Sequence, residues 1–173
     1  MYEAEITQEI DSGHKLDLPY DSKCNGWHGH RWKVVVTLRS EDLNPNGMMQ
    51  DFISIKEAIK EFDHKFFLHM PDVWGMLEEP ELLLASPSEK ELGYFEVEEG
   101  KMVDLQIDPE LQLVFKTNAN GIILTGFQPT SENLARVFFE KIDNMLYGES
   151  VEVVQVELWE TPSTKTVYRR DER

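Results

Sequence analysis

The stretch that decides the fold is residues 24–38, CNGWHGHRWKVVVTL. Its second half is rich in β-branched residues and predicts a β-strand over residues 30–39. Alternate side chains of a strand lie on one face of the sheet. His28 and His30 are two residues apart and therefore share a face with the apolar residues at the following even positions. The two imidazoles continue the buried face of this strand to its beginning.

A third imidazole comes from the strand predicted over residues 2–11. Its odd positions are mainly acidic and its even positions mainly apolar, and His14 continues the even series. If the two strands pair antiparallel, His14 meets His28 and His30. Three protein ligands and an open fourth position are typical of a catalytic zinc site. The alternative is that His-Gly-His is a turn whose polar side chains are satisfied locally.

Cys24 and the Asp63-His64 pair are further candidates for chemistry. Cys24 lies four residues before His28, so it is either a fourth metal ligand, a base or nucleophile beside an open metal, or a packed loop residue. Asp63 and His64 can hydrogen-bond only where the backbone leaves the helix that precedes them. An aspartate that orients an imidazole is typical of acid–base relays. The alternative is a histidine favoured by a helix C-terminus.

Glu160 ends the strand predicted over residues 151–160, on the face that carries Val156 and Leu158. An inward carboxylate is costly unless it is paired. A ligand with two parallel N–H donors would pair it. A salt bridge to Arg169 or Arg170 is the alternative.

The composition is that of a globular chain with an acidic surface. The net charge is −16, which disfavours binding to nucleic acid or to an anionic membrane. No apolar run approaches the ~20 residues that span a bilayer. The only cysteine cannot form an intrachain disulfide, and we expect a reducing cytoplasm. The length suits one domain over residues 1–173.

Two helices and a fourth strand complete the prediction. Ser54 and Glu57 form a capping box for a helix that ends near Asp63. A second helix begins after Pro129 and Thr130 and stops at Gly148, and a strand follows over about 164–170. Strand pairs flanking helices indicate an α+β fold with a largely antiparallel sheet.

The stretch over about 70–127 is interpreted as an insertion. Residues 94–107 alternate around Glu99-Gly100 as a hairpin would, and residues 111–127 predict a second hairpin around residues 118–120.

With these residues in hand, the chain resembles the family of 6-pyruvoyl-tetrahydropterin and 6-carboxytetrahydropterin synthases. Each motif is weak alone, but six occur in order over most of the chain. They are SGH at 12–14, CNGWHGH at 24–30, GMMQDF at 47–52, FDHKFFL at 62–68, PTSENLA at 129–135 and ET at 160–161.

The resemblance implies roles for these residues. His14, His28 and His30 would bind zinc, Cys24 would be the proton-abstracting base, and Asp63 and His64 would complete the relay. Glu160 would anchor the amino-pyrimidine edge of a pterin triphosphate, 7,8-dihydroneopterin triphosphate. The implied fold is the tunnelling fold, an antiparallel four-stranded sheet with two helices on one face. Its subunits form a β-barrel by sheet addition, commonly as a hexamer of two trimers with active sites between subunits.

One feature of the motifs favours one branch of the family over the other, and two others depart from the family pattern. The gap of three residues between Cys24 and His28 resembles the carboxytetrahydropterin branch of queuosine synthesis, since the pyruvoyl branch usually has a longer gap. The insertion is longer than is typical, whereas Ser12-Gly13 in place of small alanines should be harmless.

We therefore expect a zinc-dependent lyase that forms 6-carboxy-5,6,7,8-tetrahydropterin, acetaldehyde and triphosphate. A 6-pyruvoyl-tetrahydropterin synthase is the alternative within the family, and a non-catalytic zinc-stabilised binding module closed by Cys24 is the alternative outside it. The cations for the triphosphate are left open among Lys15, Lys23, Arg31 and Lys65.

Overall fold

The structure is a computed structural model of the whole chain. It describes residues 1–69, 94–96, 102–108, 113–118 and 121–170. The chain divides into two compact units. The first comprises Met1–Asp11, His30–Asp63 and Thr130–Arg173, and the second comprises Ser12–Gly29 and His64–Pro129.

The described strands form one mixed seven-stranded sheet and one separate pair. The order in the large sheet is β4-β7-β3-β1-β2-β8-β9, and β5 pairs with β6. The strands of the large sheet are β1 (Tyr2–His14), β2 (His28–Ser40), β3 (Phe66–His69), β4 (Tyr94–Glu96), β7 (Ile122–Thr125), β8 (Val151–Thr161) and β9 (Thr164–Arg169). The separate pair is β5 (Met102–Asp108) and β6 (Leu113–Asn118).

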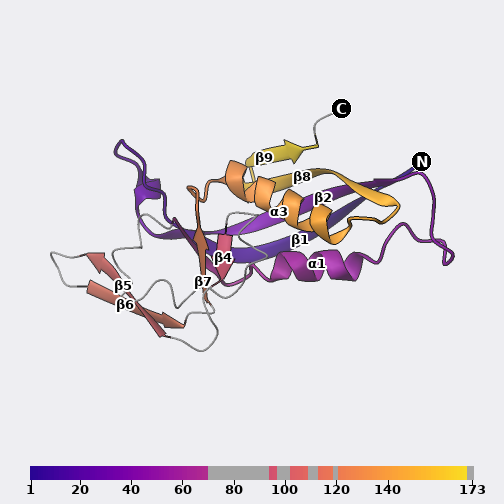
Figure 1. Cartoon of the computed structure of the whole chain (residues 1–173). Coiled ribbons are helices and arrows are strands. Elements are labelled where there is room, and N and C mark those ends of the chain that lie inside the picture. The colour runs from indigo at the N-terminus through magenta and orange to yellow at the C-terminus, as the bar shows by residue number, and fades with distance from the viewer. Residues whose placement is uncertain (70–93, 97–101, 109–112, 119–120, 171–173) are drawn as a thin grey trace. The chain divides into compact units, whose positions relative to one another are not determined.

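The first unit holds the four strands expected from the sequence together with both helices. β2 pairs antiparallel with β8, and β8 pairs antiparallel with β9. α1 (Phe52–Lys60) and α3 (Ser131–Met145) bury apolar stripes, and they lie side by side against this part of the sheet (Figure 1). The ring of Phe62 just after α1 meets that of Phe138 on α3 at 4.9 Å. The α+β prediction with two helices is confirmed.

The predicted face of β2 is buried, but Val35 and Thr37 on its other face are buried as well. Trp32, Val34 and Val36 on β2 are at most 1% exposed. A β-bulge between Thr37 and Leu38 shifts the register against β8. The bulge reverses the phase of β8, so that Val153 is buried and Glu152 is exposed.

The second unit contains strand pairings that the sequence analysis did not predict. β3 runs parallel to the end of β1 and to β7, so the sheet is mixed and wider than four strands. β4 pairs antiparallel with β7, and β5 pairs antiparallel with β6. The predicted hairpins over residues 94–107 and 111–127 are therefore both wrong. Alternation fixes which side chains share a face, but it does not identify the partner strand.

A hairpin inside the predicted insertion is present as β5 and β6. Residues 70–93, 97–101, 109–112 and 119–120 of the insertion lie outside the described residues. A single domain with an insertion at about 70–127 stays a prediction.

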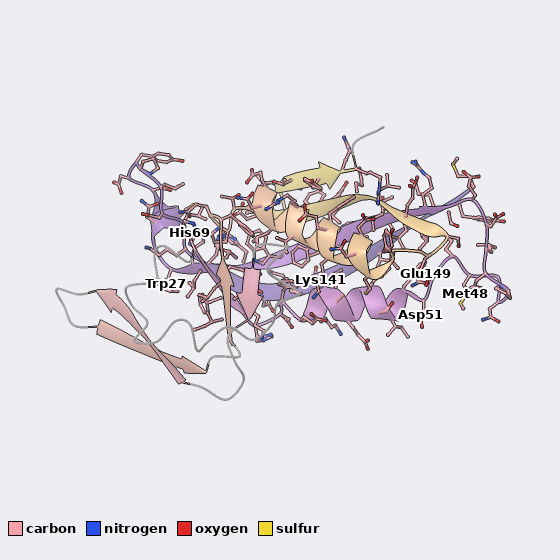
Figure 2. All side chains as sticks on the ribbon, viewed as in Figure 1. Trp27, Met48, Asp51, His69, Lys141 and Glu149 are labelled. Atoms are coloured by element: carbon pink, nitrogen blue, oxygen red, sulfur yellow. The ribbon has the colours of Figure 1, made fainter. Side chains whose placement is uncertain are left out.

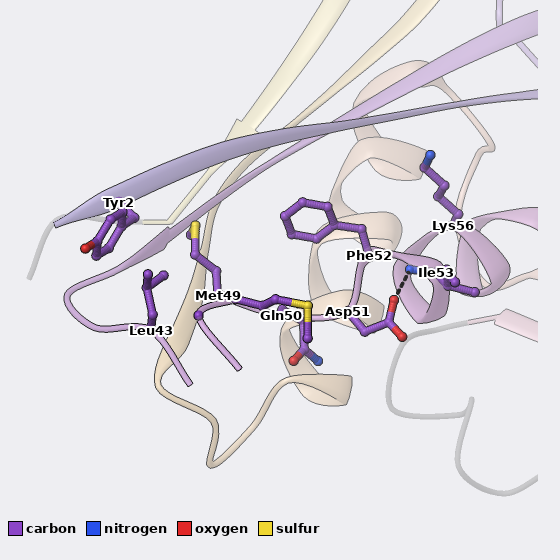
Figure 3. A pocket seen from close by; sticks show the side chains of 10 residues that line it. Tyr2, Leu43, Met49, Gln50, Asp51, Phe52, Ile53 and Lys56 are labelled. Carbon is purple, nitrogen blue, oxygen red and sulfur yellow. Dashed lines mark hydrogen bonds between the residues drawn. The ribbon is translucent and has the colours of Figure 1, made fainter. Parts of the chain in front are cut away.

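The first helix begins earlier than predicted. Asp51 is its N-cap, and its carboxylate accepts from the N–H of Ile53 at 2.9 Å (Figure 3). Ser54 lies inside the helix and donates to the carbonyl of Asp51. The Ser54-Glu57 capping box is therefore wrong, because the helix already begins at Phe52 and Asp51 caps it.

Asp51 also borders an open pocket of about 600 Å³, lined mostly by apolar side chains (Figure 3). This pocket contains none of the predicted site residues. No helix among the described residues is long and apolar enough to cross a membrane.

Candidate metal centre

The end of β1 and the start of β2 position two of the predicted ligands within the second unit. His14 is only 1% exposed. The ring centroids of His14 and His28 lie 4.4 Å apart, tilted by 56°. Gly29 runs close to the backbone of Ser12, with an added Cβ only 3.5 Å from the Ser12 carbonyl oxygen. This is an ordinary van der Waals distance, so the two chain segments are in close contact at this point.

Backbone carbonyls fix the orientation of both rings. Nδ1 of His14 lies 2.7 Å from the carbonyl oxygen of Pro129, and Nδ1 of His28 lies 2.8 Å from that of Gly26. A carbonyl only accepts, so each Nδ1 carries the proton and donates. In a neutral imidazole this leaves the lone pair on Nε2, the tautomer that binds a metal through Nε2. The sequence analysis did not identify these carbonyl partners, since backbone acceptors have no residue signature.

His30 and Glu160 lie close to each other within the first unit. Nε2 of His30 lies 3.2 Å from Oε1 of Glu160, and the ring of His30 packs edge-on against Trp32 at 4.9 Å. A tetrahedral zinc with ligands at ~2.1 Å separates neighbouring ligand atoms by roughly 3.4 Å. The distance between His30 and Glu160 is therefore compatible with two ligands of one ion.

One potential ligand atom from each of His14, His28, His30 and Glu160 lies within 4.8 Å of the others. This is a His/Glu group that could bind a metal. Imidazole nitrogen and carboxylate oxygen are donors that zinc takes in proteins. The donor set therefore fits the ion that the sequence predicts.

Glu160 has a different neighbour from those considered in the sequence analysis. Its carboxylate faces His30, whereas Arg169 donates to Gln155 and Arg170 contacts Asp143. The carboxylate thus belongs to the group that could bind a metal.

Cys24 lies in a short 3₁₀ turn, η1 (Lys23–Asn25), between the first two strands. Its N–H donates to the hydroxyl of Ser22 at 3.2 Å, and its carbonyl accepts from the N–H of Leu16 at 2.9 Å. The residue is half-buried. Cys24 is not a member of the group of possible ligands found among the described residues, whose fourth member is Glu160. A Cys-His₃ site closed by Cys24 is therefore not what the structure has.

The backbone does leave the helix at Asp63 and His64, as predicted. α1 ends at Lys60, and His64 has a φ of 57°, in the left-handed region. The carboxylate of Asp63 accepts from the N–H of Asp11 at 2.7 Å. The pairing of Asp63 with His64 stays a prediction.

Three further residues, Thr130, Arg31 and His69, lie outside the group of possible metal ligands. Thr130 caps α3 through its hydroxyl, as expected. Arg31, a candidate for the triphosphate, is held by Asp11 at 3.0 Å, and this hydrogen bond and the charge of Asp11 raise the pKa of the guanidinium. His69, left without a role by the sequence, lies at the end of β3 and contacts Gln128. Figure 2 shows His69 and Trp27 among the side chains of the chain.

Comparisons with known proteins define the class. A family profile described as 6-pyruvoyl tetrahydropterin synthase matches residues 3–171. The chain belongs to this family.

Curated relatives bear a more specific name. The 6-carboxy-5,6,7,8-tetrahydropterin synthase of Aquifex aeolicus is 29% identical over 160 residues, covering 87% of this chain and 78% of the relative. A protein of Pyrococcus horikoshii, named provisionally as the same enzyme, is 32% identical over 157 residues, covering 90% and 82%.

Solved structures agree on the fold. An uncharacterized protein from Wolinella succinogenes has a TM-score of 0.73 at 25% identity, covering 98% of each chain. The 6-pyruvoyl tetrahydropterin synthase of Plasmodium vivax has a TM-score of 0.55 at 18% identity, covering 99% of this chain and all of that one. The similarity to tunnelling-fold proteins confirms the predicted fold.

Proposed function

We propose that the protein is a zinc-dependent 6-carboxy-5,6,7,8-tetrahydropterin synthase, a lyase of pterin metabolism. The observation that carries the proposal is the convergence of ligand atoms from His14, His28, His30 and Glu160 within 4.8 Å. The names of the curated relatives and the short gap between Cys24 and His28 support the carboxy branch.

In this proposal His14, His28 and His30 hold the zinc ion. Bound zinc supplies a Lewis acid for the hydroxyl groups of the substrate side chain. The carbonyls of Pro129 and Gly26 hold the rings of His14 and His28 with Nε2 as the ligand atom. Glu160, whose carboxylate lies 3.2 Å from Nε2 of His30, is proposed to accept two N–H groups of the pterin edge.

Cys24 is proposed as the base that removes a proton from a side-chain carbon of the substrate. The residue is half-buried in the turn, which is compatible with access by a small molecule. Asp63 and His64 are proposed to carry the proton onward. The exposed position of His64 is suited to exchange with solvent.

The proposed substrate is 7,8-dihydroneopterin triphosphate, and the products are 6-carboxytetrahydropterin, acetaldehyde and triphosphate. Atom balance requires one water. We place this reaction in queuosine synthesis in the cytoplasm, where a lone cysteine stays reduced. We also propose a homo-oligomer, a hexamer of two trimers formed by sheet addition, with active sites between subunits.

The test is a mass-resolved turnover assay on the zinc-loaded protein. We expect a carboxylated pterin together with stoichiometric acetaldehyde. A diketo product that keeps its three-carbon side chain would identify the pyruvoyl reaction instead. A protein that binds zinc and leaves the substrate untouched would refute both.

The Cys24→Ala variant distinguishes the proposed enzyme from the alternative, a non-catalytic zinc-stabilised module. As a base, Cys24 is needed for turnover and not for zinc, so we expect normal zinc content and a loss of at least ~10²-fold in rate. Loss of zinc together with stability, with no turnover in the parent protein, would favour the module. The absence of Cys24 from the ligand group supports the enzyme.

A further inference from the structure

Gln128 joins the chain before α3 to the loop that carries Cys24. Its Oε1 accepts from the N–H of Asp17 at 2.9 Å, and its Nε2 lies 3.4 Å from the carbonyl oxygen of Asp17. One side-chain amide thus engages both backbone polar groups of a single loop residue. This two-point contact fixes the loop segment in position as well as in orientation.

The same contact fixes which way the amide points. The N–H of Asp17 needs an acceptor, so the oxygen of Gln128 faces it, and the nitrogen keeps a second hydrogen for another acceptor. Nε2 then donates to Nδ1 of His69 at 3.1 Å. Gln128 is therefore held from the end of β3 by His69 while it holds the loop.

On one side, Gln128 is linked to the metal ligand His14. It is followed directly by Pro129, which is buried and whose carbonyl accepts from Nδ1 of His14 at 2.7 Å. Because proline fixes its own φ, the direction of this carbonyl depends on how the peptide before it is held. That peptide joins Gln128 to Pro129, and the side-chain hydrogen bonds of Gln128 hold it in place.

On the other side, Gln128 is linked to Cys24. The two neighbours of Asp17 are both bonded to the Cys24 turn. The N–H of Leu16 donates to the carbonyl of Cys24 at 2.9 Å, and the N–H of Leu18 donates to Oδ1 of Asn25 at 3.3 Å. Movement of Asp17 would therefore disturb both of these hydrogen bonds to the turn.

We propose that Gln128 is a positioning residue that sets the orientation of His14 and the placement of Cys24 together. This inference rests on the proposed function, in which His14 binds zinc and Cys24 removes a proton. Its two consequences, on zinc affinity and on thiol reactivity, can be measured without any turnover.

The test uses Gln128→Ala in the full chain, with Gln155→Ala as the matched control. Gln155 is also hydrogen-bonded to neighbouring side chains, on β8, but lies outside this network. Zinc affinity is measured by competition with a chromophoric chelator. We expect ~10-fold weaker binding for Gln128→Ala, the loss typical of an outer partner of a metal ligand, and no change for Gln155→Ala.

The second readout is the rate of Cys24 alkylation by iodoacetamide in the zinc-loaded protein. Cys24 is the only cysteine, so the signal has one source. We expect faster alkylation in Gln128→Ala because the turn loses one of its anchors. Gln128→Glu keeps the acceptor for Asp17 and loses the donor to His69, and both effects should be intermediate.

The proposal is wrong if either zinc affinity or alkylation of Gln128→Ala stays within twofold of the parent protein. It is also wrong if the zinc-free variant loses its cooperative melting transition, because Gln128 would then be merely structural. A parent protein without turnover, in which both readouts still shift as expected, would refute the proposed function and leave this inference standing.

Discussion

At the scale of single residues, two backbone carbonyls fix the tautomer of two histidines. A neutral imidazole has two tautomers, and only the one with its lone pair on Nε2 can bind a metal through that atom. The oxygens of Pro129 and Gly26 select this tautomer in His14 and His28. The sequence could predict which imidazoles come together, because imidazole is a rare side chain and these have a distinctive spacing. It could not predict their partners.

Glu157 illustrates a charge that affects stability away from the metal centre. Lys165 lies 2.8 Å from its carboxylate, and Trp159 donates to the same group. The hydrogen bond from Lys165 lowers the pKa of Glu157 against the opposing effect of burial. Between the folded and unfolded pKa values, the unfolded chain binds more protons. The stabilisation is therefore complete above the unfolded value of ~4.3 and is lost as the pH falls through the lower folded value.

We predict that Glu157→Gln lowers the free energy of unfolding by about 1 kcal/mol at pH 7. The difference from the parent should vanish in acid, as measured by urea unfolding from pH 7 down to pH 3. Glu152→Gln on the same strand is the control. Its carboxylate lies 3.8 Å from Arg39 and is exposed, so we expect a smaller effect. A Glu157→Gln deficit that persists in acid would mean that packing, not charge, is responsible.

At the scale of elements, the parallel pairing of β1 with β3 depends on a glycine. Gly13 is opposite Phe66, and a Cβ on Gly13 would lie 2.3 Å from the Phe66 ring. The expectation that Ser12-Gly13 is harmless in place of alanines stays a prediction, but glycine has a packing role here. In this chain, the missing side chain makes room for an aromatic ring that packs edge-on against Trp27 at 5.8 Å.

We predict that Gly13→Ala destabilises the protein by ~1–3 kcal/mol through overpacking. Phe66→Leu should relieve most of this cost, so the double variant should be more stable than the sum of the single effects implies. Thermal or urea unfolding of the four proteins measures the coupling. Additive effects would show that the ring moves away freely and that Gly13 does not set the packing.

The start of α1 provides a prediction about capping. Asp51→Ala should cost about 1 kcal/mol, because the N–H of Ile53 loses its acceptor, while Asp51→Asn should cost much less. Ser54→Ala is the matched comparison, since the sequence pattern assigned the cap to Ser54. Urea unfolding measures all three variants. A larger loss in Ser54→Ala than in Asp51→Ala would contradict the cap seen in the structure.

The elements that the sequence predicted well are those with a strong local pattern. β2, β8, β9 and α3 have regular apolar periods and clear end signals, and all four are found close to the expected residues. The cap of α1 was assigned wrongly because two capping residues lie three positions apart. The pairings of β3, β4 and β7 could not be predicted, because they depend on contacts between residues far apart in the chain.

At the scale of the whole molecule, β9 is the last strand of the seven-stranded sheet, with one edge unpaired within the described chain (Figure 1). The N–H of Arg170 donates to the carbonyl of Val154 on β8. Backbone groups alternate in direction along an antiparallel strand, so Thr166 and Tyr168 also face β8 and Val167 faces away. An edge of this kind is a template for sheet addition by a second copy.

Val167→Pro tests the proposed assembly without disturbing the fold. Proline removes the outward N–H of Val167, and proline is tolerated on edge strands. If subunits join through this edge, the parent should have a mass about six times the 20.2 kDa of the chain, and the variant should dissociate to smaller species. Light scattering after size-exclusion chromatography measures both. Val167→Thr keeps the donor and should remain assembled.

Because active sites are proposed to lie between subunits, dissociated Val167→Pro should lose turnover while it retains its helices by circular dichroism. An unchanged mass of Val167→Pro would exclude the β9 edge as the contact between subunits.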